Sequence, residues 1–294
     1  MIEIIMKMKL LTTLFALALA VSVQAQTKDS IDTAQFAVVY DYTVNTLDDE
    51  GDAVCDSIQV VVQAGQRVTK CMPMSRYQAE TGSDVDFRKR VAAAHTETLT
   101  HMPTVWINHP EGETTVRDVI FPHQFEGYES TPQWKWNLTT DTLRISGYLC
   151  QRAEATHRGV RWTAWYTEEV PSSVGPWRLR GLPGLIVKAT ADAHTFTLAE
   201  LRREATAITY TPSIKIERMK YNKLVKYRNE VFGSKFYPKY PMHHIAGLSS
   251  DFNDFRPYIE QLTVVTNDNG GGYILANNLP MLQKAHVYQP LEKK

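Results

Sequence analysis

The chain has 294 residues, and its 32 Lys and Arg balance its 32 Asp and Glu, so the formal net charge is +0. This balance argues against nucleic acid as a general partner, because phosphate binding requires a basic surface. The length allows a sizeable core, and because the sequence shows no repeat and no Ser/Gly/Pro linker, we expect one domain after the leader.

The N-terminus has the pattern of a targeting segment. Two lysines precede an apolar run at residues 10–21, and Val23-Gln24-Ala25 offers a cleavage site. The run is shorter than the roughly 20 apolar residues that span a bilayer, and no cysteine follows it for lipid attachment. We therefore expect residues 1–25 to be a signal peptide that is cleaved near Ala25. Residues 26–294 should form a single β-rich domain with no transmembrane segment, located in the periplasm or at the cell surface.

Most of the remaining chain alternates between apolar and polar residues, which is typical of half-buried strands. Along the chain, the predicted strands lie at residues 36–44, 58–63 (before a turn at Ala64-Gly65), 105–107 and 116–119 (around a turn at 109–112), 134–138, 143–149 (after a turn near Thr140-Asp141), 185–191 and 195–201. Short turns between successive strands predict an antiparallel meander.

Two segments have the features of helices. Ser83 can cap a helix over residues 84–99, and Met219, Leu224, Tyr227 and Val231 form an apolar stripe over residues 215–231. Few helices beside many strands predict an α+β fold that is mainly β. The expected architecture is a single curved antiparallel sheet, a half-barrel-like meander, packed on one or two helices.

Residues 143–168 are predicted to form a long hairpin that turns at residues 157–160. Its register follows from polarity, because a slip by one residue would mix polar and apolar side chains on both faces. The favoured pairs are Thr156–Arg161, Ala155–Trp162, Glu154–Thr163, Ala153–Ala164, Arg152–Trp165, Gln151–Tyr166 and Cys150–Thr167. One face is then apolar, and the other carries Arg152, Glu154, Arg161 and Trp165.

This second face has two interpretations. It can be an ordinary solvated sheet face, in which Arg152 lies over the ring of Trp165 in a cation–π contact. It can also be a binding face, because Arg and Trp are enriched at the energetic centres of interfaces. The four residues Arg152, Glu154, Arg161 and Trp165 are therefore the candidate binding face.

The segment that follows is rich in proline and glycine. The residues that define this motif loop are Pro171, Gly175, Pro176, Trp177, Gly181, Pro183 and Gly184. No Gly-Lys-Ser/Thr follows, which excludes a phosphate-binding loop, and no nucleophile stands between the glycines, which excludes a nucleophile elbow. The segment is predicted to be a shaped loop that closes one end of the sheet.

No catalytic, metal-binding or cofactor-binding constellation is evident. The histidines His95, His101, His109, His123, His157, His194, His243, His244 and His286 fall in no metal-ligand motif. Glu168 and Glu169 are neighbours, so on a strand their carboxylates point apart. The three cysteines Cys55, Cys71 and Cys150 allow one disulfide between two of them, or three free thiols.

Several of these segments together resemble the GLPGLI family of exported Bacteroidetes proteins. The matching residues are Gly-Tyr-Leu-Cys-Gln-Arg-Ala at 147–153, Arg158-Gly159, Trp-Thr-Ala-Trp-Tyr-Thr at 162–167, Gly175-Pro176-Trp177 and Gly-Leu-Pro-Gly-Leu-Ile at 181–186. Residues 287–292 resemble a changed form of the Asn-Pro-Ile-Glu ending of that family. The resemblance implies export from a Gram-negative cell and implies no reaction. The pattern of elements is also similar to the half-barrel of periplasmic lipoprotein carriers, which is an analogy of fold only.

The expected function is that of a non-enzymatic exported protein that binds an apolar or amphipathic ligand in the cell envelope. A concave sheet over a helix would offer the apolar mouth in which such sites form. The first alternative is an accessory protein that docks an outer-membrane protein through the motif loop and the face of Arg152 and Trp165. The second alternative is a hydrolase or a metal-dependent enzyme. No cofactor is predicted.

Overall fold

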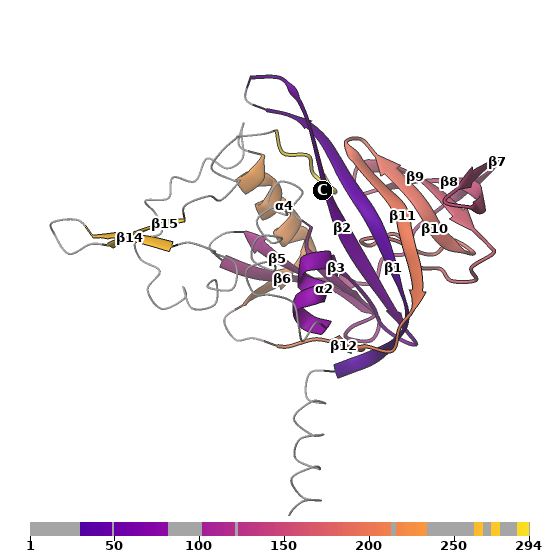
Figure 1. The fold of residues 1–294 in the computed structure, drawn as a ribbon, viewed down its shortest axis with the longest axis horizontal. Coiled ribbons are helices and arrows are strands. Elements are labelled where there is room, and N and C mark those ends of the chain that lie inside the picture. The colour runs from indigo at the N-terminus through magenta and orange to yellow at the C-terminus, as the bar shows by residue number, and fades with distance from the viewer. Residues whose placement is uncertain are drawn as a thin grey trace, which may run out of the picture.

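The structure is a computed structural model, and it describes residues 30–48, 50–81, 102–120, 123–212, 216–233, 262–266, 272–276 and 287–293. The strands of its large sheet are β1 (Ser30–Leu47), β2 (Ala53–Gly65), β3 (Thr69–Pro73), β4 (Thr104–Ile107), β5 (Glu113–Ile120), β6 (His123–Ser130), β7 (Asn137–Ile145), β8 (Tyr148–His157), β9 (Val160–Thr167), β10 (Leu185–Ala191), β11 (His194–Arg203), β12 (Ala207–Thr209) and β13 (Glu217–Lys220) (Figure 1). The helices are α2 (Met74–Thr81) and α4 (Tyr221–Phe232). A separate hairpin consists of β14 (Leu262–Thr266) and β15 (Gly272–Ala276).

The large sheet is mainly an antiparallel meander that meets its own beginning. Its strand order is β13-β6-β5-β4-β3-β2-β1-β11-β10-β9-β8-β7, so strands β1 to β6 and β7 to β11 are two runs of neighbours joined where β11 pairs with β1. Only β13 is parallel to its neighbour, β6. The prediction of a mainly β fold with one large, mostly antiparallel sheet and few helices is confirmed for the described residues.

The connection between the two runs limits how far apart the ends of the sheet can lie. In the strand order β6 and β7 are ten strand spacings apart, which would be roughly 48 Å in a flat sheet. Residues 131–136 join these two strands, and six extended residues bridge at most about 25 Å. The ion pair between Arg158, in the β8–β9 turn, and Glu129, on β6, also crosses this opening. The ends of the meander therefore lie close together, although β6 and β7 do not pair.

The main core lies on one face of the large sheet. Alternate residues of distant strands belong to one apolar cluster, including Tyr42 of β1, Val105 of β4, Trp162 of β9 and Phe196 of β11. Helix α4 adds Tyr221, Leu224, Val225 and Phe232 to the same cluster. It approaches β6 at Gly127, where a Cβ would come within 2.7 Å of the Tyr221 ring. A smaller cluster on the opposite side of the sheet joins Ala37, Val39 and Val61 to Met74 and Tyr77 of α2.

The register predicted for the central hairpin is confirmed. Strands β8 and β9 pair from His157–Val160 to Gln151–Tyr166, with Ala155 opposite Trp162 and Arg152 opposite Trp165. The paired register ends one residue before the predicted Cys150–Thr167 pair. Buried Ala153, Trp162 and Ala164 face the core, as the polarity argument requires.

Three predicted boundaries are wrong. Residues 134–136 precede β7 rather than lie on a strand, and the turn expected near Thr140-Asp141 is a bulge inside β7 between Leu138 and Thr142. The real turn is at Ser146-Gly147, where both residues have positive φ. Helix α4 begins at Tyr221 because the residues before it pair as β13 with β6. The helix expected over residues 84–99 lies outside the described residues.

Candidate functional site

The predicted binding face is assembled by the β8–β9 register, but its charges pair with one another. The Arg161 guanidinium lies 2.6 Å from a carboxylate oxygen of Glu154, and Arg152 contacts both Glu154 and, at 3.0 Å, Asp141 of β7. The hydrogen bond from Arg161 lowers the pKa of Glu154. Among the described contacts Arg152 therefore binds carboxylates, and the predicted cation–π contact with Trp165 is absent. Trp165 is half-buried between Arg152 of β8 and Lys188 of β10.

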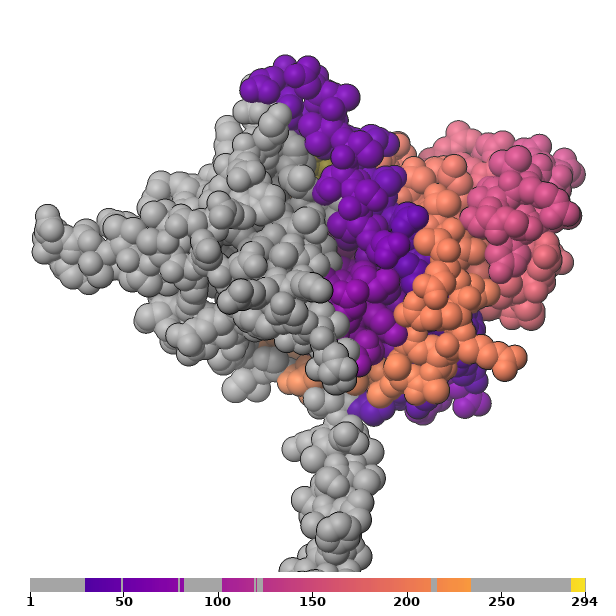
Figure 2. Space-filling view, in the orientation of Figure 1, coloured from indigo at the N-terminus to yellow at the C-terminus, as the bar shows by residue number. Residues whose placement is uncertain are grey.

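Exposed leucines surround the same end of the sheet. Leu138 and Leu143 of β7 and Leu149 of β8 are 48%, 51% and 51% exposed. Among the described residues, the other large apolar side chains that are exposed to solvent are Leu47 and Tyr227. In the space-filling view, β7 and β8 form the pink surface at the right of the molecule (Figure 2). By the β7–β8 register, Leu138 and Leu149 lie on the face of Ala153, and Leu143 lies on the opposite face, with Arg152 and Glu154. We call the three exposed leucines of this edge, Leu138, Leu143 and Leu149, the leucine patch.

The motif loop, by contrast, turns its larger side chains into the core. Trp177 is buried and has a left-handed φ of 55°, which is unusual for a residue with a bulky side chain. Its ring stacks on Trp162 at 5.6 Å, and its backbone N–H donates to the sulfur of Cys71 at 3.2 Å. Gly175, Pro176 and Gly184 are also buried, whereas Pro171, Gly181 and Pro183 are exposed. The loop is therefore chiefly a core-closing element.

The arginine that follows Trp177 organises a buried cluster of charges. Only 1% of the Arg178 side chain is exposed, and its guanidinium contacts Glu129 of β6 and, at 2.6 Å, Glu292 near the end of the chain. The guanidinium also lies 4.2 Å from the ring centre of Tyr221 on α4. Arg158 approaches both carboxylates from the β8–β9 turn. Burial raises the pKa of Glu292, and Arg178 opposes this shift.

Two histidines lie beside this region in positions that disfavour their charged form. Burial, followed by the nearby guanidinium groups of Arg178 and Arg158, lowers the pKa of His157 to about 4. Burial also lowers the pKa of His194 to about 4, although hydrogen bonds to the backbone of Pro290 and Gln289 oppose the shift. The Nδ1 of His194 lies 2.9 Å from the hydroxyl of Tyr42. Neither histidine joins a metal-binding group among the described residues.

A buried lysine on the opposite side of the sheet has a structural explanation. Burial lowers the pKa of Lys70 to about 8, a change that can mark a nucleophile. However, its ammonium group bonds to Glu80 and to both oxygens of Thr209, so its three donors are used. The ring of Trp106 lies 5.0 Å below it, and Arg117 stacks near the same ring. Glu80 therefore balances the charge of the Lys70 ammonium group, and all three N–H donors of that group are used in structural hydrogen bonds.

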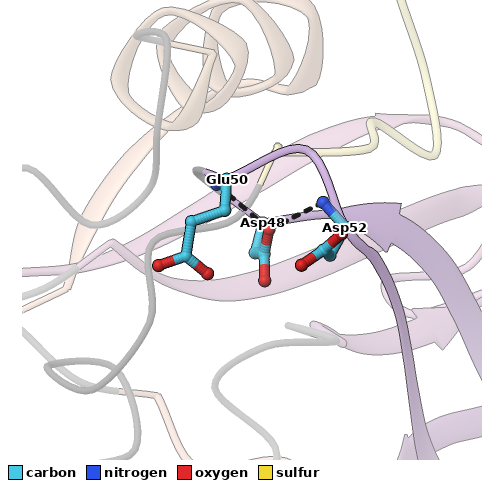
Figure 3. Close-up of side chains that lie close together, drawn as sticks. All are labelled: Asp48, Glu50 and Asp52. Carbon is cyan, nitrogen blue, oxygen red and sulfur yellow. Dashed lines mark hydrogen bonds between the residues drawn. The ribbon is translucent and has the colours of Figure 1, made fainter.

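Three carboxylates gather in the β1–β2 turn, a feature that the sequence analysis missed. Oxygen atoms of Asp48, Glu50 and Asp52 lie within 4.8 Å of one another (Figure 3). An oxygen of Asp48 accepts hydrogen bonds from the backbone N–H groups of Glu50 and Asp52, which closes the turn. Carboxylates of this kind bind hard cations such as Ca²⁺, which takes six to eight oxygens. The acidic residues within 48–52 could have indicated this cluster from the sequence. The hydrogen bonds of Asp48 give the cluster a structural role, which is to close the turn.

The three cysteines are free in the structure. Cys55 is exposed, whereas Cys71 and Cys150 are buried. Burial raises the pKa of Cys71 to about 12 and that of Cys150 to about 11, so both stay protonated at neutral pH. Protonated thiols are poor nucleophiles and poor metal ligands.

Comparison with known proteins identifies one family segment. Residues 156–188 match a Bacteroidetes-associated family described as "Protein of unknown function (Porph_ging)". These residues include the second half of the central hairpin and the motif loop. No curated protein matches the chain in sequence. No helix among the described residues is long and apolar enough to cross a membrane.

Three solved structures are similar to the chain at low identity. One is PNGF-II, with 14% identity and a TM-score of 0.46 over 70% of this chain and 34% of that chain, so this chain spans about a third of PNGF-II. A DUF1329 family protein from Desulfovibrio piger has 10% identity and a TM-score of 0.26 over 58% and 87% of the two chains. A LolA superfamily protein from Nitrosomonas europaea has 10% identity and a TM-score of 0.24 over 60% and 87%.

The leucine patch and the partners of Arg178 were not predicted from the sequence. The bulge in β7 adds two residues between Leu138 and Thr142 and leaves the alternation of the strand unchanged. Leu138 and Leu143 therefore lie on opposite faces of an edge strand, and alternation alone did not reveal that both are exposed. An arginine inside an apolar loop was a signal for a buried ion pair, because a buried charge must be paired. Its partner Glu292 is 114 residues away, which local patterns do not indicate.

The two ends of the Gly181–Gly184 motif should differ in their response to alanine. A Cβ at Gly184 would lie 2.5 Å from the carbonyl carbon of Thr167, so Gly184→Ala should lower the free energy of unfolding by about 2–3 kcal/mol. Gly181 has a φ of +87° with open space around it, so Gly181→Ala should cost only about 1 kcal/mol. Urea unfolding measures both, and equal losses would contradict this assignment.

Acid should weaken the fold through His157 and His194, whose pKa values are lowered in the native protein. The unfolded chain binds a proton at each of them below pH 6.5, whereas the native protein does so only near pH 4. The free energy of unfolding should therefore fall between pH 6.5 and 4, by up to about 1.4 kcal/mol per pH unit for each histidine. Urea unfolding at pH 7, 5.5 and 4.5 should show a shallower decline for His194→Phe than for the natural protein. Parallel declines would show that His194 does not contribute.

Thiol titration should distinguish the cysteines. One equivalent, Cys55, should react with Ellman's reagent at pH 8 in the folded protein, because it is exposed. Cys71 and Cys150 should react only after unfolding. The variant Cys55→Ser provides the control and should show no fast reaction; a fast equivalent that survives this substitution would contradict the burial of the other two thiols.

Proposed function

We propose that this protein is an exported, non-catalytic binding protein of the bacterial cell envelope, of the GLPGLI type, and that it binds an amphipathic ligand at the β7–β9 end of its sheet. The leucine patch is the observation on which this proposal depends. The proposal keeps the predicted class of ligand and moves the site from the concave side of the sheet to its outer end.

The filling of the core supports this location. We propose that the bent sheet is a half-barrel, whose concave side would be the usual place for an apolar ligand. In the described residues that side contains Trp162, Tyr166, Trp177 and Phe196, all of which are buried in one cluster. These side chains supply the apolar contacts that a bound ligand would otherwise provide.

The leucine patch and the charged face together match an amphipathic molecule. Burying a fully exposed leucine contributes about 1.5–3 kcal/mol, so three leucines that are half exposed offer roughly 3 kcal/mol in total. The paired charges of Arg152, Glu154 and Arg161 lie on the face that Leu143 shares, where a polar head group can form hydrogen bonds, and the other two leucines lie on the opposite face of the same edge. Exposed apolar surface beside polar groups is typical of a binding site.

Binding of a single-chain amphiphile tests the proposal. Lysophosphatidylethanolamine, kept below its critical micelle concentration, should bind to the purified protein with saturation in native mass spectrometry and in isothermal titration calorimetry. Substituting Leu138, Leu143 and Leu149 by Ser should weaken this binding at least ten-fold, because the buried apolar area is lost. All three positions are half exposed, so stability should change little.

Leu47 provides the matched control. It is 47% exposed but lies at the C-terminal end of β1, which strands β8 to β11 separate from β7 in the sheet. Leu47→Ser should therefore leave the dissociation constant within two-fold of the natural value. The double variant Arg152→Ala with Trp165→Ala reports whether the charged face takes part. Unchanged binding by the triple leucine variant would refute the proposed site, and absence of saturable binding by the natural protein would refute the ligand class.

A further inference from the structure

Residues 287–293, which we call the strap, cross the top of the sheet without joining it (yellow in Figure 1). They form no strand pair. Their backbone–backbone hydrogen bonds run from the N–H of Val287 to the carbonyl of Leu47, and from the N–H of Lys293 to the carbonyl of Arg158. The side chains of Thr46 and Asn229 also donate to the carbonyls of Val287 and Glu292. The strap can therefore leave its place without breaking any strand pairing of the sheet or any turn of a helix.

The side chains of the strap contact several parts of the protein, and we call the residues around them the strap groove. Tyr288 packs on Phe232 of α4 at 5.3 Å between ring centres, and its hydroxyl donates to the side chain of Asn229. Leu291 is buried in the main core cluster. The side-chain amide of Asn229 donates to the backbone carbonyl of Glu292 at 2.8 Å. Separate parts of the groove therefore contact the aromatic ring of Tyr288, the aliphatic side chain of Leu291 and the carboxylate of Glu292.

The carboxylate of Glu292 occupies the most polar part of this groove. Its Oε1 lies 2.6 Å from Arg178, 3.5 Å from Arg158 and 3.7 Å from the imidazole of His157. Glu292 is only 4% exposed, and it shares both arginines with Glu129 of β6. The groove is therefore an anion site, and the chain itself supplies the anion.

We propose that this groove is a peptide-binding site for segments of the pattern aromatic-x-Pro-Leu-Glu, which the strap fills in cis, and that the strap opens as a unit while the sheet stays folded. The ligand class is an acidic peptide whose carboxylate pairs with Arg178 and Arg158. Elements with few backbone bonds open locally at a lower free energy than the whole fold. This site is separate from the leucine patch, so either proposal can fail without the other.

Hydrogen exchange in the full-length protein tests the opening of the strap. The amides of Val287 and Lys293 should exchange through an opening that is insensitive to low urea concentrations and is at least 100-fold more frequent than global unfolding. Amides of the central β1–β11 pair should exchange only with global unfolding. Glu292→Gln should accelerate exchange at Val287 and Lys293 at least ten-fold and leave the β1–β11 amides nearly unchanged. Exchange of the strap amides solely through global unfolding would overturn the proposal.

Binding in trans tests the peptide site. A chain that stops at residue 286 should bind the acetylated peptide Val-Tyr-Gln-Pro-Leu-Glu-Lys-Lys, followed by fluorescence anisotropy of a labelled peptide. The matched peptide with Gln in place of Glu292 should bind at least ten-fold more weakly. Equal binding of the two peptides, or a folded shortened chain that binds neither, would overturn the assignment of the groove. If the shortened chain does not fold, the exchange of Glu292→Gln in the full chain decides the matter.

Discussion

A guanidinium group that is almost completely removed from water is the feature on which the rest of this structure depends. Charge inside a protein is costly unless it is paired where it lies, and Arg178 sits at the inner end of the motif loop. Its two carboxylate partners come from β6, at one end of the meander, and from the strap. The loop, the far end of the sheet and the strap are thereby held at one point. Removing one of the two carboxylates is expected to be more damaging than its net contribution suggests, because the buried guanidinium is then paired with a single carboxylate.

The short connection between the two runs of strands lies beside this charge. The short connection between β6 and β7 brings the open ends of the meander together, and the motif loop passes beneath that connection. Trp134 and Trp136 donate their indole N–H groups to the backbone carbonyls of Arg178 and Arg180. The connection is thus tied to the loop by side chains at the place where two strands would otherwise have paired. The family-matching segment is in this way used mainly for architecture.

The sequence was informative where neighbouring residues decide the structure. The register of β8 and β9 could be predicted because one hairpin contains both the apolar face, with Ala153 and Trp162, and the polar face, with Arg152 and Glu154. The alternation of Trp134 and Trp136 correctly indicated that the two rings lie on one side of the chain, but the prediction of a strand there was wrong. The two rings do lie on one side and stack at 5.2 Å, but they bind the extended backbone of the motif loop through their side chains rather than through a strand ladder. The start of α4 was misplaced because Met219 and its neighbours pair with β6, a contact between segments about 90 residues apart, for which helix propensity carries no information.

The bulge in β7 has a consequence for how the molecule behaves among its own copies. A long, regular terminal strand with half-exposed leucines would offer a continuous row of amide groups for another sheet to continue. In β7 the ladder is interrupted between Leu138 and Thr142, so only short stretches of regular backbone remain on either side. An interruption of this kind favours contacts through side chains over strand-by-strand polymerisation. The exposed leucines of this edge can therefore face solvent without offering a long regular strand edge to another copy of the chain.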